Sequence, residues 1–280
     1  MQVKYKAVKT AYWRPGDDYV ARILVAMSHR LLDGDILVVS EKAISTAKGN
    51  IISEADVEPR RLAYFLARFW MRVVWGYFLG YMCRFRNETL KRLKTYPVME
   101  GSRHKQTVIN YAGFVHALNY GSEGGIDISN LPYAYASLPL KEPVAEACHL
   151  RKRVTEATGK QVTVIIADTD STFSFGQFHV TSRPQAVGGI KSVRGPLPFL
   201  VGRALKLRQR ATPVAVAGVV VSVEDALRFA DIAHHARGSG AGRTIWDGAA
   251  TFGVGLSEIN WELLETITHQ PLVVIRKVAS

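Results

Sequence analysis

Two acidic side chains occupy positions at which proteins commonly bind ligands. Asp127 follows a glycine pair and precedes Asn130 by three residues, and Asp168 follows the apolar or β-branched run 162–166 through a single alanine. A buried strand that ends on a carboxylate is typical of the carboxyl edge of an open α/β sheet, where ligands bind. The glycine pair would let the backbone bend and approach a ligand closely.

The oxygen atoms that these stretches offer suit a hard cation. Asp127, Asp168 and the hydroxyl of Thr169 supply carboxylate and hydroxyl ligands. Mg²⁺ or Mn²⁺ carrying a phosphate group accepts such ligands, whereas zinc prefers nitrogen and sulfur. The alternative is that both aspartates only cap turns, because aspartate is common after strands. Residue types alone leave both interpretations open.

Two further stretches offer contacts to phosphate. Ser40 and Lys42 follow the apolar run 36–39, and a lysine just past a strand can neutralise phosphate as a point charge. The glycine-rich run 238–244 could wrap phosphates with its backbone amides, although it lacks the ending of a P-loop. Each has a plainer alternative, which is a solvated lysine for Lys42 and an ordinary surface loop for 238–244.

The composition is that of a folded globular protein with a basic surface. Apolar residues make up 48% of the 280 and the net charge is +12. Excess lysine and arginine attract nucleic acid, acidic membrane faces or small anionic ligands. A basic surface of an archaeal or thermophilic type explains the charge equally well, and no long basic tail is present.

The cysteines and the amino terminus indicate a reducing compartment. Cys83 and Cys148 are far apart and form no CxxC pair, which argues against a disulfide scaffold and a zinc–thiolate site. The first residues alternate lysine with apolar side chains and contain no apolar signal core. We therefore expect a cytoplasmic protein.

Hydrophobic periodicity predicts a mixture of helices and strands. Apolar spacing predicts helices over 19–32, 143–159 and 223–236. Apolar and β-branched runs predict strands over 3–8, 36–39, 162–167, 214–221 and 272–277. We expect a linker or surface hairpin over 87–105, and a long functional loop with short strands over 170–194.

The aromatic stretch 62–85 looks at first like a membrane span. Arg68, Arg72 and Arg84 interrupt it, and a charged residue near the bilayer centre costs about 2.5–3.5 kcal/mol. We therefore expect a buried or interface helix, with 62–86 contributing an oligomer contact and no membrane partner. Association with a membrane through this stretch is the weaker alternative.

Several ordered motifs resemble the coenzyme F420-0:L-glutamate ligase family, whose members are γ-glutamyl ligases acting on a deazaflavin cofactor. The PGDD turn at 15–18 is similar to an early GDD turn of the family, and 34–42 is similar to its GDVVVVTSK strand and lysine. The run GIDISN at 125–130 resembles the family's GIDESN, and IIADT at 165–169 resembles IISDT. The two aspartate motifs in this order are the specific part, and the pieces together span most of the chain.

The resemblance implies a mixed α/β fold, a homodimer and a ligase that joins L-glutamate to an anionic acceptor such as coenzyme F420-0. GTP would phosphorylate the acceptor carboxylate and the glutamate amine would displace that phosphate, with Mg²⁺ or Mn²⁺ neutralising charge. Carried over by motif, the metal ligands are Asp127, Asp168 and Thr169. The implied nucleotide contacts are Ser40, Lys42, Asn130, Gly238, Ser239 and Gly240.

The chain also departs from the family pattern. The family carries arginines shortly after its second aspartate, whereas 169–176 of this chain contains none, and 244–269 has the character of an insertion. We expect one ligase-like domain with subregions of about 1–120 and 121–280. The alternative function is a divergent paralogue that binds a nucleotide or RNA on the same scaffold without ligase activity.

Overall fold

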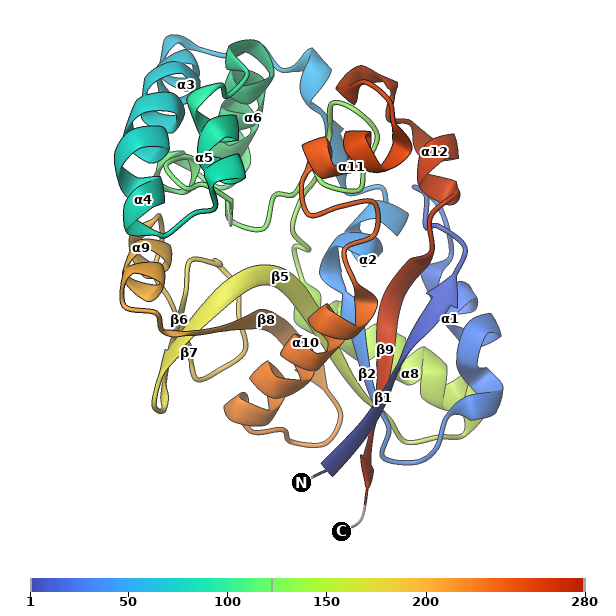
Figure 1. Cartoon of the computed structure of the whole chain (residues 1–280). Coiled ribbons are helices and arrows are strands. Elements are labelled where there is room, and N and C mark those ends of the chain that lie inside the picture. The colour runs from blue at the N-terminus through green and yellow to red at the C-terminus, as the bar shows by residue number, and fades with distance from the viewer. Residues whose placement is uncertain (1, 122, 279–280) are drawn as a thin grey trace.

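A mixed seven-stranded sheet organises the chain in the computed structural model, which describes residues 2–121 and 123–278 (Figure 1). The strands run in the order β1-β9-β2-β5-β6-β7, and β8 pairs with β5 outside this path. Their bounds are β1 Gln2–Thr10, β2 Ile36–Ser40, β5 Thr163–Phe175, β6 Phe178–Thr181, β7 Ile190–Ser192, β8 Arg208–Ala217 and β9 His269–Val278. A small second sheet pairs β3 (Ile51–Ser53) with β4 (Tyr135–Ser137). The mixed α/β fold class is confirmed.

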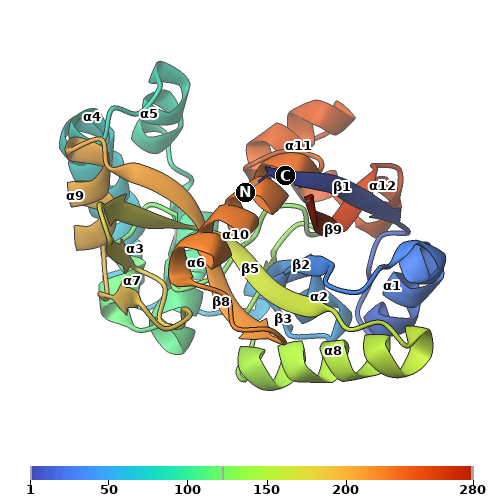
Figure 2. The same ribbon diagram turned by 90° about the horizontal axis from the view of Figure 1, so that it is seen from below.

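Alternation along the central strands creates two cores on opposite faces of the sheet. Leu37 and Ile166 pack with helices α1 (Tyr19–Met27) and α8 (Pro143–Thr158), whereas their neighbour Ile165 packs with α10 (Val223–Arg237). Side chains on a strand point alternately to either face, so buried runs of this kind need cover on both sides. Figure 2 shows α8 and α10 on opposite sides of β5.

Strand β5 is longer than the sequence predicts. The first part, Thr163–Ala167, pairs in parallel with β2, and the register against β8 then shifts between Asp168 and Ser171. The chain continues as strand to Phe175 and pairs with β6. The loop expected over 170–194 is therefore wrong at its start, because a β-bulge re-aims the strand instead of ending it.

A group of helices occupies the side of the molecule beyond β5 (Figure 1). Its members are α3 Arg61–Phe65, a π-helix Leu66–Leu79, α4 Gly80–Met82, α5 Asn87–Lys94, α6 Val98–Tyr111 and α7 Phe114–Ala117. The expected linker or hairpin over 87–105 is wrong, because α5 buries Leu90 and Leu93 at helical spacing and α6 begins at Val98 and buries His104 and Lys105.

The aromatic stretch is helical, as expected, but it is wound as a π-helix. Leu66, Met71, Trp75 and Gly80 are buried, at intervals of four or five residues. A helix that winds once every four to five residues places all four on one side, which the tighter α-helix would not. None of the described helices, this one included, is both long and apolar enough to cross a membrane.

Four more α-helices are α2 Glu41–Ala47, α9 Leu197–Ala204, α11 Ile245–Phe252 and α12 Trp261–Glu265. Of these, α2 and α9 contact the sheet whereas α11 and α12 form a separate small core. Helices α11 and α12 lie within 244–269 and share a small apolar core around Ile259 and Leu264. The sheet takes strands from both expected subregions of the domain. The division near residue 120 and the insertion at 244–269 stay predictions.

Candidate functional site

A cavity of about 560 Å³ opens beside the end of β2 and the start of α2. Eight of the nine predicted metal and nucleotide residues line it: Ser40, Lys42, Asp127, Asn130, Thr169, Gly238, Ser239 and Gly240. Strand β2 ends at Ser40, the carboxyl end of its parallel pairing with β5, which is where α/β sheets bind ligands. Segments more than a hundred residues apart in the chain therefore form one wall.

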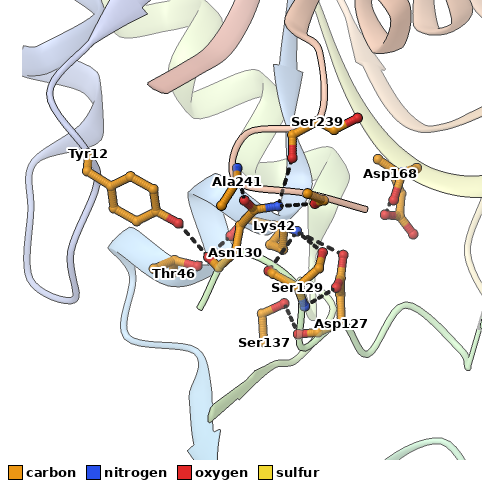
Figure 3. Close-up of polar contacts among 12 residues, drawn as sticks. Tyr12, Lys42, Thr46, Asp127, Ser129, Asn130, Ser137, Asp168, Ser239 and Ala241 are labelled. Atoms are coloured by element: carbon orange, nitrogen blue, oxygen red, sulfur yellow. Dashed lines mark hydrogen bonds and ion pairs between the residues drawn. The ribbon is translucent and has the colours of Figure 1, made fainter. Parts of the chain in front are cut away.

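Lys42 and Asp127 form the centre of this wall (Figure 3). The ammonium of Lys42 lies 2.9 Å from Oδ2 of Asp127 and donates to the hydroxyl and the carbonyl of Ser129 at 2.9 and 3.0 Å. Burial alone would raise the pKa of Asp127, but the Lys42 charge and hydrogen bonds from Ser129 hold it below its usual value. Asp127 is therefore ionised at neutral pH, and the lysine presents a cation whose position is fixed.

Asn130 fixes the glycine-rich loop to the pocket wall. Its side-chain amide donates to the carbonyls of Ser239 and Gly242 at 3.1 and 2.9 Å, and its Oδ1 accepts from the backbone N–H of Ala241 at 2.7 Å. Its backbone is left-handed, with φ of 50°, and Tyr12 donates a hydrogen bond to its carbonyl. The side chain thus positions the loop, and its contact to nucleotide stays a prediction.

Asp168, the ninth predicted residue, does not line the cavity and stands apart from the Lys42–Asp127 pair in Figure 3. It is buried, its Oδ1 accepts the backbone N–H of Thr169 at 2.7 Å, and its Oδ2 lies 3.4 Å from Nε of Arg183. Its two successors, Thr169 and Asp170, do line the cavity. The carboxylate therefore lies immediately behind the wall.

Arg183 joins the carboxyl ends of β2 and β5. Its guanidinium is fully buried and forms ion pairs with Glu41 and Asp168, and it donates to the carbonyl of Gly124 at 3.1 Å. Burial raises the pKa of Glu41 to about 7 although Arg183 opposes that shift. No periodicity or motif around residue 183 pointed to a role for Arg183.

The glycine pair before Asp127 permits a close approach of Arg183, and its expected approach to a ligand stays a prediction. A Cβ on Gly125 would lie 1.0 Å from Nη1 of Arg183, and the φ of Gly125 is 89°. Only glycine leaves space for the guanidinium here and takes this conformation without strain. The position requires glycine because Arg183 packs directly against it.

The donors present fit a divalent cation that arrives with its phosphate. Among the described residues, no three His, Cys, Asp or Glu side chains are grouped closely enough to hold a metal by themselves. Oδ2 of Asp168 is buried and accepts no hydrogen bond from the described residues. Mg²⁺ is commonly held by one or two carboxylates together with substrate phosphates, and Asp127, Asp168 and Thr169 are suitable donors for such a site.

Basic side chains also line the cavity. Arg237 is partly buried at the end of α10, and its Nη1 atom is buried without a hydrogen-bond partner among the described residues. Burial lowers the pKa of Arg237 to about 10, so it remains charged at neutral pH. His234 and Arg243 lie nearby in the lining, and burial lowers the pKa of His234. The sequence-based prediction missed Arg237, although its place directly before Gly238 was a signal.

Comparison with known proteins agrees with these motifs. Residues 7–228 match the model of the F420-0:γ-glutamyl ligase family. The chain belongs to this family.

Proteins named as ligases and an uncharacterized protein are similar to this chain over most of its length. An uncharacterized protein of Methanocaldococcus jannaschii is 35% identical over 282 residues, covering 96% of this chain and 94% of the relative. The coenzyme F420:L-glutamate ligase of Methanopyrus kandleri is 31% identical, covering 76% of this chain and 75% of the ligase. The enzyme of the same name from Methanothermobacter thermautotrophicus is 30% identical over 72% of this chain and 73% of its own length.

Proposed function

We propose that the protein is a GTP- and divalent-metal-dependent ligase that forms an amide between L-glutamate and an anionic acceptor such as coenzyme F420-0. The observation that carries this proposal is the single cavity that gathers Lys42, Asp127, Thr169 and the loop 238–240. The names of the related ligases supply the donor and the acceptor class. Mg²⁺ or Mn²⁺ is the proposed cofactor, and a homodimer is the expected assembly.

The reaction needs two displacements. An oxygen of the acceptor carboxylate attacks the γ-phosphorus of GTP and GDP leaves, which forms an acyl phosphate. The glutamate amine then attacks the acyl carbon, phosphate leaves and the nitrogen loses a proton. Positioning and charge stabilisation supply most of the catalysis in phosphoryl transfer, so a rigid wall of charged groups suits the first step.

Different residues of the cavity are suited to bind the phosphates and the divalent ion in this reaction. Lys42, which Asp127 and Ser129 hold beside the cavity before the ligands bind, then binds a phosphate oxygen as a point charge. Backbone amides of the loop 238–240, which Asn130 holds, surround another phosphate. Asp127, Asp168 and Thr169 would hold the divalent ion, which supplies charge neutralisation when bound.

Two further basic residues of the lining, Arg237 and His234, complete the assignment. Arg237 binds the negatively charged acceptor or its phosphate and replaces the arginines that the family carries after its second aspartate. His234 is neutral at pH 7 because burial lowers its pKa, so it can accept the amine proton.

The proposal is tested by product analysis with purified protein, GTP, Mn²⁺, L-glutamate and F420-0. We expect a glutamyl adduct and GDP in equal amounts, and a loss on the order of 100-fold in rate for Asp127→Asn and Asp168→Asn. Asp56→Asn, an exposed aspartate away from the cavity, is the matched control and should retain full activity. Nucleotide binding without turnover in the unaltered protein would instead favour the paralogue that binds a nucleotide and has lost ligase chemistry.

A further inference from the structure

The helices between Arg61 and Met82 expose a continuous apolar stripe. Phe65, Phe69, Phe78 and Met82 are 45–65% exposed. Successive members of this set are four, nine and four residues apart. In a helix that makes one turn every four to five residues, these intervals correspond to one, two and one turns. The opposite side, which carries Leu66 and Trp75, is buried. The exposed side chains therefore share one face, on which Phe65 and Phe69 stack on each other and much of the apolar surface stays open to solvent.

Basic residues surround this stripe. Residues 59–97 contain nine arginines and lysines and one acidic residue, Glu88. This segment thus carries two-thirds of the net charge of +12. The exposed arginines at 61, 68, 84 and 86 form no ion pair with any residue in 2–121 or 123–278. The surface combines an apolar centre with a rim of free positive charge.

A neighbouring helix extends the same edge of the molecule. Helix α9 packs against α4 and exposes Leu197, Val201 and Leu205, one helical turn apart. Figures 1 and 2 both place α9 beside α4 at the outer side of the helical group, away from α1. The cavity lies elsewhere, between β2 and α10.

We propose that this face docks on a membrane surface rich in anionic lipid. A helix with aromatic and aliphatic residues on one side and arginine and lysine beside it lies in the plane of the membrane interface. Its apolar side chains enter the boundary of the acyl chains while the arginines remain with the headgroups. No spanning helix is required, in agreement with the absence of one among the described residues.

Charge and shape argue against the other occupants. A second copy of the chain would bring two surfaces of strong positive charge together across a two-fold axis, which repels. RNA binds to grooves in which aromatic rings accept stacked bases. Here Phe65 and Phe69 already pack against each other, with ring centres 5.3 Å apart, on the convex surface of a helix. The oligomer contact expected at 62–86 stays a prediction, which the experiment below distinguishes from the lipid contact proposed here.

The experiment is flotation of the full-length protein with vesicles of phosphatidylcholine alone or mixed with phosphatidylglycerol. We expect binding to the mixed vesicles, with weaker binding at high salt because the charges are screened. Phe65→Ser, Phe69→Ser and Phe78→Ser together should lower the partition coefficient by at least about tenfold. Replacing Arg61, Arg68 and Arg84 by glutamine should abolish the preference for phosphatidylglycerol.

The matched control changes three other exposed apolar residues, Tyr5→Ser, Val25→Ser and Leu32→Ser, on β1 and beside α1. It should bind vesicles like the unaltered protein, and all variants should show unchanged melting temperatures. No binding to either vesicle, or an equal loss in this control, overturns the proposal. So does a stable dimer that the phenylalanine variant converts to monomer, or RNA binding that this variant loses while vesicle binding is absent.

Discussion

Lys42 and Asp127, which the motifs predict as ligand-binding residues, form an ion pair with each other in the structure. The lysine is paired with the carboxylate at 2.9 Å, so its charge is partly neutralised before any phosphate arrives. A divalent ion that binds Asp127 would compete with this ammonium and release it toward the phosphate. The motif predicted the two residue types and their place, while their mutual contact depends on a fold that joins residues 85 positions apart.

Gly125 is the residue on which the packing of Arg183 depends most directly. Gly125→Ala would place a methyl group 1.0 Å from the guanidinium, which must then leave Glu41 and Asp168. Breaking a buried ion pair costs about 3–5 kcal/mol, and we expect a loss of this size in the free energy of unfolding. Gly113→Ala has a similar φ of 93° and open space, so it should lose only about 1–2 kcal/mol. Equal losses in urea denaturation would contradict the close-packing interpretation.

Arg237 should determine the affinity for an anionic substrate. Arg237→Gln removes a partly buried guanidinium whose buried Nη1 atom lacks a hydrogen-bond partner among the described residues. Loss of one charge-assisted hydrogen bond should raise KM for GTP or for the acceptor about tenfold to a hundredfold with a smaller change in kcat. Arg237→Lys should recover part of the affinity because the charge is kept. Unchanged KM values for every substrate would remove Arg237 from the site.

At the scale of elements, hydrophobic pattern predicted the central strands and the long helices well. The runs that become β2, β9 and α8 are periodic and bounded by turn residues, so local sequence is sufficient. Pattern failed for α5 and α6, whose many polar and basic residues concealed a narrow apolar side. It also failed at the bulge in β5. Beyond the register shift between Asp168 and Ser171 the strand continues because it pairs with β8, and this tertiary contact cannot be read from the local sequence.

The loop after α10 depends on one side chain for its shape. Asn130→Gly keeps the left-handed backbone and removes all three hydrogen bonds to the loop. We expect KM for GTP to rise about tenfold while the melting temperature changes little, because the loop and not the core is loosened. Asn130→Asp keeps the acceptor for the N–H of Ala241, so its KM for GTP should lie between those of the unaltered protein and Asn130→Gly. A large drop in melting temperature with unaltered KM would show a purely structural role.

A buried charge cluster ties α6 to the loops beside it. His104 lies 2.7 Å from Glu54 and 2.5 Å from Glu123, and Lys105 also pairs with Glu123. Burial favours the neutral imidazole, but the two carboxylates outweigh it and raise the pKa of His104 to about 10. Because the pKa is raised on folding, the resulting stability is complete below the unfolded pKa of about 6.5 and is lost as pH rises toward 10.

His104→Gln tests this cluster through its pH dependence. At pH 6 the free energy of unfolding of the variant should be about 3 kcal/mol lower than that of the unaltered protein, because both carboxylates lose a buried cationic partner. The difference should shrink as pH rises from 7 toward 10, where the unaltered protein loses the same contribution. Denaturation curves at several pH values measure it. A difference that is constant over this range would show that His104 is not charged in the folded state.

At the scale of the whole molecule, the site exists because the sheet brings distant segments to one edge. Strand β2 delivers Ser40, the start of α2 delivers Lys42, the bulge of β5 delivers Thr169, and α10 delivers Arg237 and the loop after it. The two aspartate motifs predicted half of this arrangement. Arg237 was missed because the end of its helix carries no recognised motif, although it directly precedes the glycine-rich run 238–244, which contains Arg243.

The central claim is that Asp127 and Asp168 hold a divalent ion at the phosphates of a nucleotide in this cavity. Crystals soaked with GTP and Mn²⁺ and measured at a wavelength where manganese scatters anomalously test it directly. We predict an anomalous peak in contact with oxygens of both aspartates, nucleotide density in the cavity of about 560 Å³, and Lys42 moved onto a phosphate. Manganese and nucleotide bound elsewhere, with the pairs Lys42–Asp127 and Arg183–Asp168 intact, would contradict it.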